Sequence, residues 1–253
     1  MISVVCVYND MGIYNEYLLS SIQRQNGDHE LIAMDNRDGY FKSAAQALND
    51  GGRRAKGDYI MFVHQDVQLK RDDWLNRAEE MLKSLGGFGI AGVAGRKDRS
   101  GVITVITHGS PPKLAGSIQL SEPVKVQTVD ECLFFVPREI FATVNMDEQT
   151  CKDWHLYAVD YSLSIQERGL AAYVLPLEAY HAYPGYSVSR GLLPEEYVST
   201  LRRIITKHKS HYSTIYTTCG IWSIVFPFSV YAIYLRLRQR IREFLAGSTC
   251  QEK

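Results

Sequence analysis

The fold of this chain is decided by residues 59–66, which read Tyr-Ile-Met-Phe-Val-His-Gln-Asp. Five apolar residues run directly into three polar ones, a pattern that predicts a buried strand ending at a ligand site. The same pattern occurs twice earlier, where the apolar run 2–7 leads into Tyr8-Asn9-Asp10 and the run 31–34 leads into Asp35-Asn36. The sequence therefore predicts three strands that each end in polar side chains.

The segments between these strands have helical spacing. Apolar residues recur at helical intervals from about Met11 to Gln25, and Ser43 is a good N-cap for a helix that includes residues 44–48. Parallel neighbouring strands need such long crossover connections. Because α/β sheets bind ligands at the carboxyl edge of their strands, the polar residues after the three strands are expected to share one binding edge.

The second half predicts a more mixed order of elements. The expected elements are a helix over 74–85 capped by Asp72, a strand over 89–93, a long strand over 124–136, a helix that begins at Pro137, a helix over 154–168 and a strand over 172–177. No internal repeat or linker precedes Gly191. We expect an α/β domain over residues 1–190, with a mostly parallel sheet flanked by helices, and a helical tail over 191–253.

Composition excludes several classes of protein. The chain has 253 residues, 45% of them apolar, which argues against wholesale disorder, collagen and low-complexity sequence. Its 28 basic and 28 acidic residues give no net charge, so a general nucleic-acid binder is not expected. Five cysteines without a Cys-x-x-Cys pair fit neither a disulfide scaffold nor a zinc knuckle, and the first apolar run is too short for a signal peptide. A reducing, cytoplasmic setting is the expectation.

The tail differs in charge from the rest of the chain. From Leu201 onward nine Lys and Arg stand against two acids, so this segment carries +7 and the remainder −7. The 24 residues of 212–235 contain no charge, are rich in aromatic residues and in Ser and Thr, and precede four arginines. These features favour a segment in the headgroup layer on the inner face of the cell membrane. The alternative is a pair of helices that docks on the body or on a second copy as a homodimer.

A Gly-x-Gly-x-x-Gly motif at residues 87–92 does not predict a dinucleotide site. The glycines follow an expected helix, whereas the dinucleotide fingerprint follows a strand and opens a helix.

The chain resembles the family 2 glycosyltransferases of the GT-A fold from residue 2 to about 190. The resemblance is carried by the segments 4–10, 34–36, 47–51 and 55–67, in that order and spacing. It implies a site for a nucleoside-diphosphate sugar, UDP- or dTDP-linked. The donor-binding residues it implies are Val7, Tyr8 and Asn9 near the base, Asp35 and Asn36 at the base or ribose, and Asp66 at the diphosphate. On the residues alone, Asp35 and Asp66 could instead cap turns.

The resemblance also implies a divalent metal ion. Where the family usually has Asp-x-Asp, this chain has His64-Gln65-Asp66, a variant that resembles one subgroup. One carboxylate, a histidine and substrate phosphates remain a suitable site for Mn²⁺ or Mg²⁺. His181, after a later strand, matches a position from which the family supplies a further ligand, although a histidine there could simply be a polar strand end.

The family's motif does not identify the general base, because its Glu-Asp pair falls on Tyr157-Ala158 in this chain. Asp160 is the preferred base, and Asp153, Asp147 and His155 are the alternatives. Asp160 could also serve only as an ion-pair partner near the helix start.

Acceptor-binding residues are expected to be Asp130, Glu131 and His155. Asp130 and Glu131 interrupt a strand-like run, which indicates either a lined cleft or an exposed edge strand. Arg190 is expected to close over the diphosphate on the loop 183–190.

The resulting hypothesis is an inverting, metal-assisted transfer of a sugar to a hydroxyl of a glycan acceptor, lipid-linked, in cell-surface polysaccharide synthesis. The alternative is a catalytically silent nucleotide-sugar-binding scaffold, motivated by Ala158. A nucleotidyltransferase is disfavoured because residues 8–10 cannot cradle a triphosphate.

Overall fold

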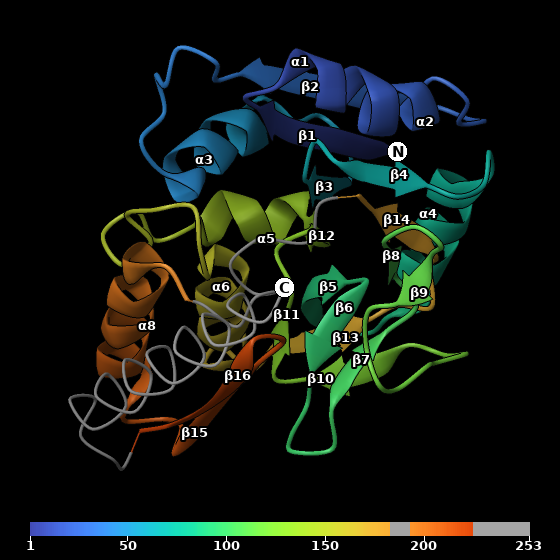
Figure 1. Ribbon diagram of the computed structural model, residues 1–253. Coiled ribbons are helices and arrows are strands. Elements are labelled where there is room, and N and C mark those ends of the chain that lie inside the picture. The colour runs from blue at the N-terminus through green and yellow to red at the C-terminus, as the bar shows by residue number, and fades with distance from the viewer. Residues whose placement is uncertain (183–192, 225–253) are drawn as a thin grey trace, which may run out of the picture.

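The structure is a computed structural model and describes residues 1–182 and 193–224 (Figure 1). Its centre is a seven-stranded sheet with the order β10-β13-β5-β12-β3-β1-β2. The strands are β1 (Ile2–Tyr8), β2 (His29–Asp35), β3 (Tyr59–Val63), β5 (Phe88–Gly92), β10 (Val124–Val126), β12 (Leu133–Pro137) and β13 (Ala171–Val174). All except β10 and β12 run in one direction. The expected mostly parallel α/β sheet is therefore confirmed.

Helices cover both faces of this sheet. They are α1 (Met11–Tyr14), the π-helical turn η1 (Asn15–Leu19), α2 (Ser20–Ile22), α3 (Ala44–Arg54), α4 (Trp74–Ser84), α5 (Arg138–Thr143), α6 (Tyr157–Gln166) and α8 (Glu195–His208). The first three form one continuous helical run, as expected. The side chain of Asp10 accepts the N–H of Ile13, and that of Ser43 accepts the N–H of Gln46, so both helical segments start at a side-chain cap.

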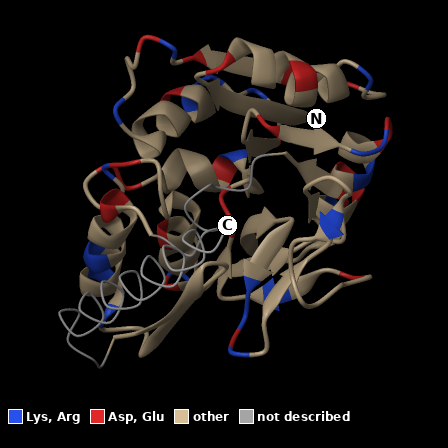
Figure 2. Ribbon diagram, in the orientation of Figure 1, with Lys and Arg blue, Asp and Glu red and all other residues tan. Residues whose placement is uncertain are grey.

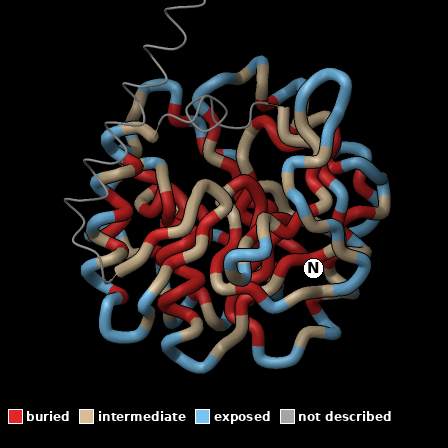
Figure 3. The backbone as a smooth tube through the Cα atoms, turned by 60° about the horizontal axis from the view of Figure 1, so that its bottom comes forward, coloured by how far each residue is buried: buried red, intermediate tan, exposed pale blue. Residues whose placement is uncertain are grey.

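Successive side chains of β1 point to opposite faces of the central sheet and pack into two separate hydrophobic cores. Ile2, Val4, Cys6 and Tyr8 pack with the helical run 11–22 and with α4, whereas Val5 packs with α3, α5 and α6 on the other face. The sheet is thus the middle layer of three. The buried backbone runs through the centre of the molecule, and the exposed segments are mostly loops at its periphery (Figure 3).

Two smaller sheets flank the central one. The first has the order β11-β6-β7, from Thr128–Val129, Ala94–Arg96 and Val102–Thr104, and the second has the order β4-β14-β8-β9, from Val67–Leu69, Ala179–His181, Thr107–His108 and Lys113–Leu114. In the second sheet His181 is opposite Val67. This register brings His181 next to Asp66, although the two residues are far apart in the sequence.

Two expected elements are corrected. The run 124–136 is divided into β10, β11 and β12, because residues 130–132 turn the chain from the small sheet into the central one. The helix expected over 154–168 begins only at Tyr157, after Leu156 in a left-handed conformation. Pro137 ends β12 and directly precedes α5, in agreement with its expected place at a helix start.

The described part of the tail packs against the body. Helix α8 contributes Tyr197, Leu201 and Ile204 to a third core with residues of α6 and of the hairpin β15 (Thr214–Thr217) and β16 (Gly220–Ser223). The expectation of a helical tail is therefore wrong for 214–223, where two short strands rich in β-branched and aromatic residues pair around residues 218–219. Residues 225–253, with the four arginines, lie outside the described residues.

Charge on α8 follows the helix dipole, with Glu195 and Glu196 in its first turn and Lys207 in its last (Figure 2). None of the helices in residues 1–182 and 193–224 is long and apolar enough to cross a bilayer.

Two glycines of the Gly-x-Gly-x-x-Gly motif serve packing, and the first, Gly87, has a positive φ of 59°. Gly89 and Gly92 lie in β5, where an added Cβ would come within 2.1 Å of Ile165 and 2.9 Å of Val129. The motif leads into a strand and opens no helix, as the sequence analysis expected.

Candidate active site

A pocket of about 660 Å³ lies at the carboxyl edge of β1, β2 and β3. It is lined by Asn9 after β1, Asn36 after β2 and residues 64–66 after β3, together with Trp154 and Tyr157. The expected common edge of the three strands is therefore present. We call this cavity the donor-side pocket.

Each side chain of His64-Gln65-Asp66 contacts a different part of the fold. His64 Nε2 lies 2.9 Å from the hydroxyl of Tyr157 in α6. Gln65 Oε1 accepts the N–H groups of Asn9 and Asp10, and its amide donates to Asn9 Oδ1. Asp66 Oδ2 lies 3.3 Å from Nε2 of His181 in β14. The tripeptide thus joins the end of β3 to β1, α6 and the small sheet.

His64, Asp66 and His181 form a metal-ligand cluster, in which one ligand atom from each lies within 4.8 Å of the others. His181 Nε2 is buried, and in the described residues it makes no contact with hydrogen-bond geometry, despite the nearby Asp66. A buried imidazole nitrogen aimed at a carboxylate suits a divalent cation, which takes both as ligands. The residues therefore fit the expected Mn²⁺ or Mg²⁺, and His64 adds a third ligand to the expected pair.

Electrostatics at this cluster keep the carboxylate ionised. Burial would raise the pKa of Asp66, but His181 and His64 outweigh it and lower that pKa. Burial lowers the pKa of His64, which favours the neutral, metal-binding imidazole. Burial would also lower the pKa of His181, yet Asp66 raises it overall. A metal ion would therefore compete with a proton at His181.

The donor-side residues are only partly where the sequence analysis expects them. Val7, Tyr8, Asn9 and Asn36 line the pocket, whereas Asp35 does not. The exposed carboxylate of Asp35 accepts two hydrogen bonds from Arg37 Nε and one from Nη2, and the Arg37 guanidinium lowers the pKa of Asp35 to about 2. Asp35 thus holds Arg37, which lines the pocket, and its direct contact with a base or ribose stays a prediction.

Two residues of this loop take on other roles. The side chain of Asn36 accepts the N–H of Phe41 and donates to its carbonyl, so Asn36 shapes the loop that borders the pocket. Arg37 itself lines the pocket, as does Lys42, and the sequence analysis missed both. The sequence feature that could have identified them is the presence of two basic residues in the loop after the second strand.

A second pocket of about 380 Å³ shares His64 and Trp154 with the first. Asp130, Glu131 and His155, the three expected acceptor residues, all line it, as does His181. We call it the acceptor-side pocket. The interpretation of Asp130 and Glu131 as residues of a lined cleft, rather than of an exposed edge, is confirmed.

The C-terminal segment completes this pocket with Pro194, Tyr197, Thr217, Thr218 and Cys219. Thr218 donates its hydroxyl to Asp130 Oδ2 at 2.5 Å across 88 positions of sequence. No local pattern in the sequence indicated these residues, because only the tertiary fold brings them to the site.

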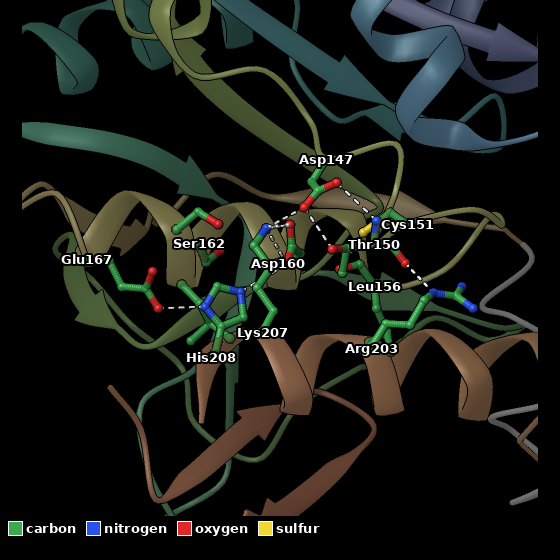
Figure 4. Close-up of polar contacts among 12 residues, drawn as sticks. Asp147, Thr150, Cys151, Leu156, Asp160, Ser162, Glu167, Arg203, Lys207 and His208 are labelled. Carbon is green, nitrogen blue, oxygen red and sulfur yellow. Dashed lines mark hydrogen bonds and ion pairs between the residues drawn. The ribbon is translucent and has the colours of Figure 1, made fainter. Parts of the chain in front are cut away.

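Asp160 does not occupy a catalytic position. Its side chain is 2% exposed and lines neither pocket. Lys207 Nζ lies 2.8 Å and His208 Nε2 lies 2.9 Å from its carboxylate oxygens (Figure 4). The prediction of Asp160 as the general base is therefore wrong, because α6 turns this residue toward α8. The structure instead confirms the alternative expectation, in which Asp160 is an ion-pair partner near the helix start. Its partners are Lys207 and His208.

The alternative bases Asp147 and Asp153 are also engaged elsewhere. Asp147 pairs with Lys207, and Asp153 pairs with Arg203 at 2.9 Å. Neither lines the two pockets. Of the candidate bases, His155 alone lines the acceptor-side pocket. Arg190 lies outside the described residues.

Residues 3–182 match the profile of a family described as the "Glycosyltransferase like family". The chain belongs to this family. Membership confirms the resemblance found in the sequence, and it confirms the expected enzyme class, a glycosyltransferase.

One curated protein is a sequence relative of this glycosyltransferase. It is described as "ATP synthase subunits region ORF 6" of Fuscovulum blasticum. It is 28% identical over an alignment of 194 positions, and the match covers 72% of this chain and 75% of the relative.

Solved structures share the fold at low sequence identity. The structure of GalNAc-T7 with UDP, GalNAc and Mn²⁺ matches 81% of this chain, with a TM-score of 0.57 at 14% identity. The structure of mannosyltransferase PcManGT from Pyrobaculum calidifontis with GDP-Man and Mn²⁺ matches 83% of this chain, with a TM-score of 0.57 at 15% identity. S. aureus TarS 1-349 with UDP-GlcNAc matches 81% with a TM-score of 0.57 at 13% identity. These likenesses confirm the GT-A fold. The match covers 47%, 64% and 66% of those three chains.

Proposed function

We propose that this glycosyltransferase moves a sugar from a nucleoside-diphosphate sugar to a hydroxyl of a glycan acceptor. The observation that carries the proposal is the junction of the two pockets, where His64 lines both and belongs to the metal-ligand cluster. A donor whose nucleoside lies in the donor-side pocket would have its diphosphate beside Asp66. Its sugar would then face the acceptor-side pocket.

The residues at this junction have separate tasks. His64, Asp66 and His181 would hold Mn²⁺ or Mg²⁺, which when bound neutralises charge on the departing diphosphate. Arg37 and Lys42 add positive charge to the wall of the donor-side pocket, as a phosphate-bearing ligand requires. Tyr8 is stacked on Tyr14 with ring centroids 4.6 Å apart, so it offers a fixed wall to the base.

The finer parts of the proposal concern the donor, the acceptor and the place of the enzyme. A UDP- or dTDP-linked donor and inversion at the anomeric carbon rest on the family resemblance. A lipid-linked acceptor in cell-surface polysaccharide synthesis, and attachment to the inner face of the membrane, rest on the basic and aromatic composition of residues 212–253. The same composition would equally suit contact with a second copy of the chain.

Nucleotide binding tests the proposal directly. Thermal unfolding is measured for wild type and Asp66→Asn with UDP, dTDP, GDP and CMP, each with and without Mn²⁺ or Mg²⁺. A ligand at a hundredfold excess over its Kd adds about 2.7 kcal/mol to the free energy of unfolding. We expect a metal-dependent shift for one diphosphate in wild type and its loss in Asp66→Asn.

The matched control is Asp73→Asn, which removes an exposed carboxylate paired with Arg71 outside both pockets. This variant should keep the wild-type response. The proposal is rejected if no diphosphate shifts wild type in the presence of metal, or if Asp66→Asn responds as wild type does.

A silent binding scaffold is the second candidate. It is favoured by Ala158, fully buried where the family has its Asp, and by the burial of Asp160 against α8. The transferase and the silent scaffold differ in whether the bound donor is turned over. A transferase releases nucleoside diphosphate from the donor that binds, whereas a scaffold binds the donor and leaves it intact.

A further inference from the structure

We propose that His155 is the general base that takes the proton of the acceptor hydroxyl. This inference rests on the proposed transferase function and names the residue that replaces the missing Asp at position 158.

His155 lies at the right place for this task. It precedes Leu156 and α6, and it lines the acceptor-side pocket beside Trp154, which lines both pockets. An acceptor bound in this pocket would therefore have its hydroxyl between His155 and the donor sugar. A general base must be within hydrogen-bond reach of the proton that it removes.

The ring of His155 is held by packing and keeps its nitrogens available. Its centroid lies 5.8 Å from that of Tyr197 in α8, with the ring planes tilted by 59°. Within residues 1–182 and 193–224, neither ring nitrogen has a hydrogen-bond partner. A lone pair on one of them can therefore accept a proton from a bound hydroxyl.

Four other proton acceptors of this pocket, Asp130, Glu131, His64 and His181, each face a group of the fold. Asp130 accepts hydrogen bonds from Thr218 and from the N–H of Cys132. Glu131 accepts the N–H of Leu156. His64 contacts Tyr157, and His181 faces Asp66. His155 shares with His108, which also lines this pocket, the absence of a hydrogen-bond partner within residues 1–182 and 193–224. His155 differs from His108 because it directly follows Trp154, which lines both pockets and so marks their junction.

The surroundings of His155 favour its neutral form at neutral pH. Burial lowers the pKa of His155, and the opposing charges of Asp153 on its own loop and Glu196 on α8 raise it less. Tyr197 packs on the ring from α8, and His64, which lines the same pocket at the end of β3, has its pKa slightly lowered by His155. A neutral imidazole is the form that can accept a proton.

The reaction step balances without a further reactant. The acceptor oxygen forms a bond to the anomeric carbon of the donor sugar, and its proton moves to a ring nitrogen of His155. The bond between the anomeric carbon and the diphosphate oxygen breaks, and its electron pair leaves with the nucleoside diphosphate. His155 then returns the proton to solvent.

The test measures nucleoside diphosphate release from UDP-glucose, UDP-galactose, dTDP-glucose and GDP-mannose with Mn²⁺. Water and a set of octyl glycosides serve as acceptors. We compare wild type, His155→Gln and His155→Ala, with His29→Gln as the matched control because His29 lies at the start of β2, away from both pockets. General base catalysis contributes about 10²–10⁴-fold, so kcat of His155→Gln should fall by about that factor.

Three further readouts separate catalysis from a structural role. His155→Gln should bind nucleoside diphosphate and Mn²⁺ as wild type does in thermal shifts. The acid limb of the wild-type pH profile, from protonation of His155, should be absent in His155→Gln. Added imidazole should restore turnover of His155→Ala, at a rate that follows the concentration of neutral imidazole.

The outcomes distinguish this inference from the function on which it rests. Turnover of His155→Gln within threefold of wild type, or an unchanged acid limb, overturns the role of His155 and leaves the transferase function standing. A wild type that releases no nucleoside diphosphate from any donor overturns the transferase function, and the role of His155 with it.

Discussion

The carboxylate of Glu131 accepts a hydrogen bond from the backbone N–H of Leu156, at the turn that leads into α6. Leu156 has φ 65° and ψ 13°, and within residues 1–182 and 193–224 it is the one non-glycine residue with positive φ. A left-handed leucine costs about 1–2 kcal/mol, because its Cβ crowds the following carbonyl. Glu131 thus holds the strained turn that presents Trp154 and His155 to the two pockets.

This contact predicts a pH-dependent stability. Burial, and next the charge of Asp130, raise the pKa of Glu131 well above its usual value, and the N–H of Leu156 only partly opposes them. The raised pKa means that the unfolded state loses this proton first as pH rises above about 4.5. The free energy of unfolding should therefore fall with pH through the folded-state pKa of Glu131.

Glu131→Gln keeps an oxygen for the N–H of Leu156 and removes the proton. Urea unfolding across pH 5–8 should show a smaller loss of stability with rising pH in this variant than in wild type. If the free energy of unfolding changes with pH in the same way for both proteins, the pKa of Glu131 is the same in the folded and unfolded states and this prediction is wrong.

The carboxylate of Asp160 should matter for stability rather than for nucleotide binding. Asp160→Asn leaves Lys207 and His208 without their buried counter-charge, and breaking such a buried pair costs about 3–5 kcal/mol. Thermal and urea unfolding measure this loss. Asp73→Asn, which breaks an exposed pair with Arg71, should cost about 1 kcal/mol or less. A stable Asp160→Asn protein with no turnover would return Asp160 to the catalytic site.

The parts of the site that the sequence could predict are those with a local pattern. Residues 64–66 follow a buried strand, so their place at the sheet edge follows from strand period and the rule for parallel sheets. Asp130 and Glu131 interrupt an apolar run, which is also a local signal. For these residues, local sequence patterns were sufficient to predict that they line a ligand-binding cleft.

The errors come from contacts that no local pattern encodes. Asp160 was misread because its partners Lys207 and His208 lie 47 and 48 positions later, on a helix whose docking face the sequence does not show. The hairpin 214–223 was not predicted because its strands have no clear polar–apolar alternation and lie within a long aromatic, uncharged run that also fits a helix. The ion pair of Asp35 with Arg37 was likewise not predicted, because only the side-chain geometry shows it.

Packing at β5 predicts that Gly89 tolerates no side chain. A Cβ at Gly89 would lie 2.1 Å from Ile165 of α6, in a fully buried layer between sheet and helix. Overpacking of this kind costs about 1–3 kcal/mol, so Gly89→Ala should lower the free energy of unfolding by that amount. Gly86→Ala, with no atom within 4 Å of the added carbon, is the matched control and should stay near wild type. Equal stability of both variants would show that α6 can move away from β5 at little cost.

Trp154 should report ligand binding through its fluorescence. Its side chain is 41% exposed and lines both pockets, whereas Trp74 and Trp222 are 1% and 4% exposed within separate cores. A nucleoside diphosphate bound with Mn²⁺ beside Trp154 changes the polarity and contacts of that indole alone, so titration should change the emission of wild type.

Trp154→Phe removes the reporter and keeps an aromatic ring at the junction of the pockets. In this variant the emission change should vanish, while the thermal shift caused by the same nucleotide and Mn²⁺ persists, because the candidate metal ligands His64, Asp66 and His181 are untouched. Trp74→Phe is the matched control, and its emission should still respond to the nucleotide. A response that survives in Trp154→Phe and disappears in Trp74→Phe would place the nucleotide on the α4 side of the sheet and away from the two pockets.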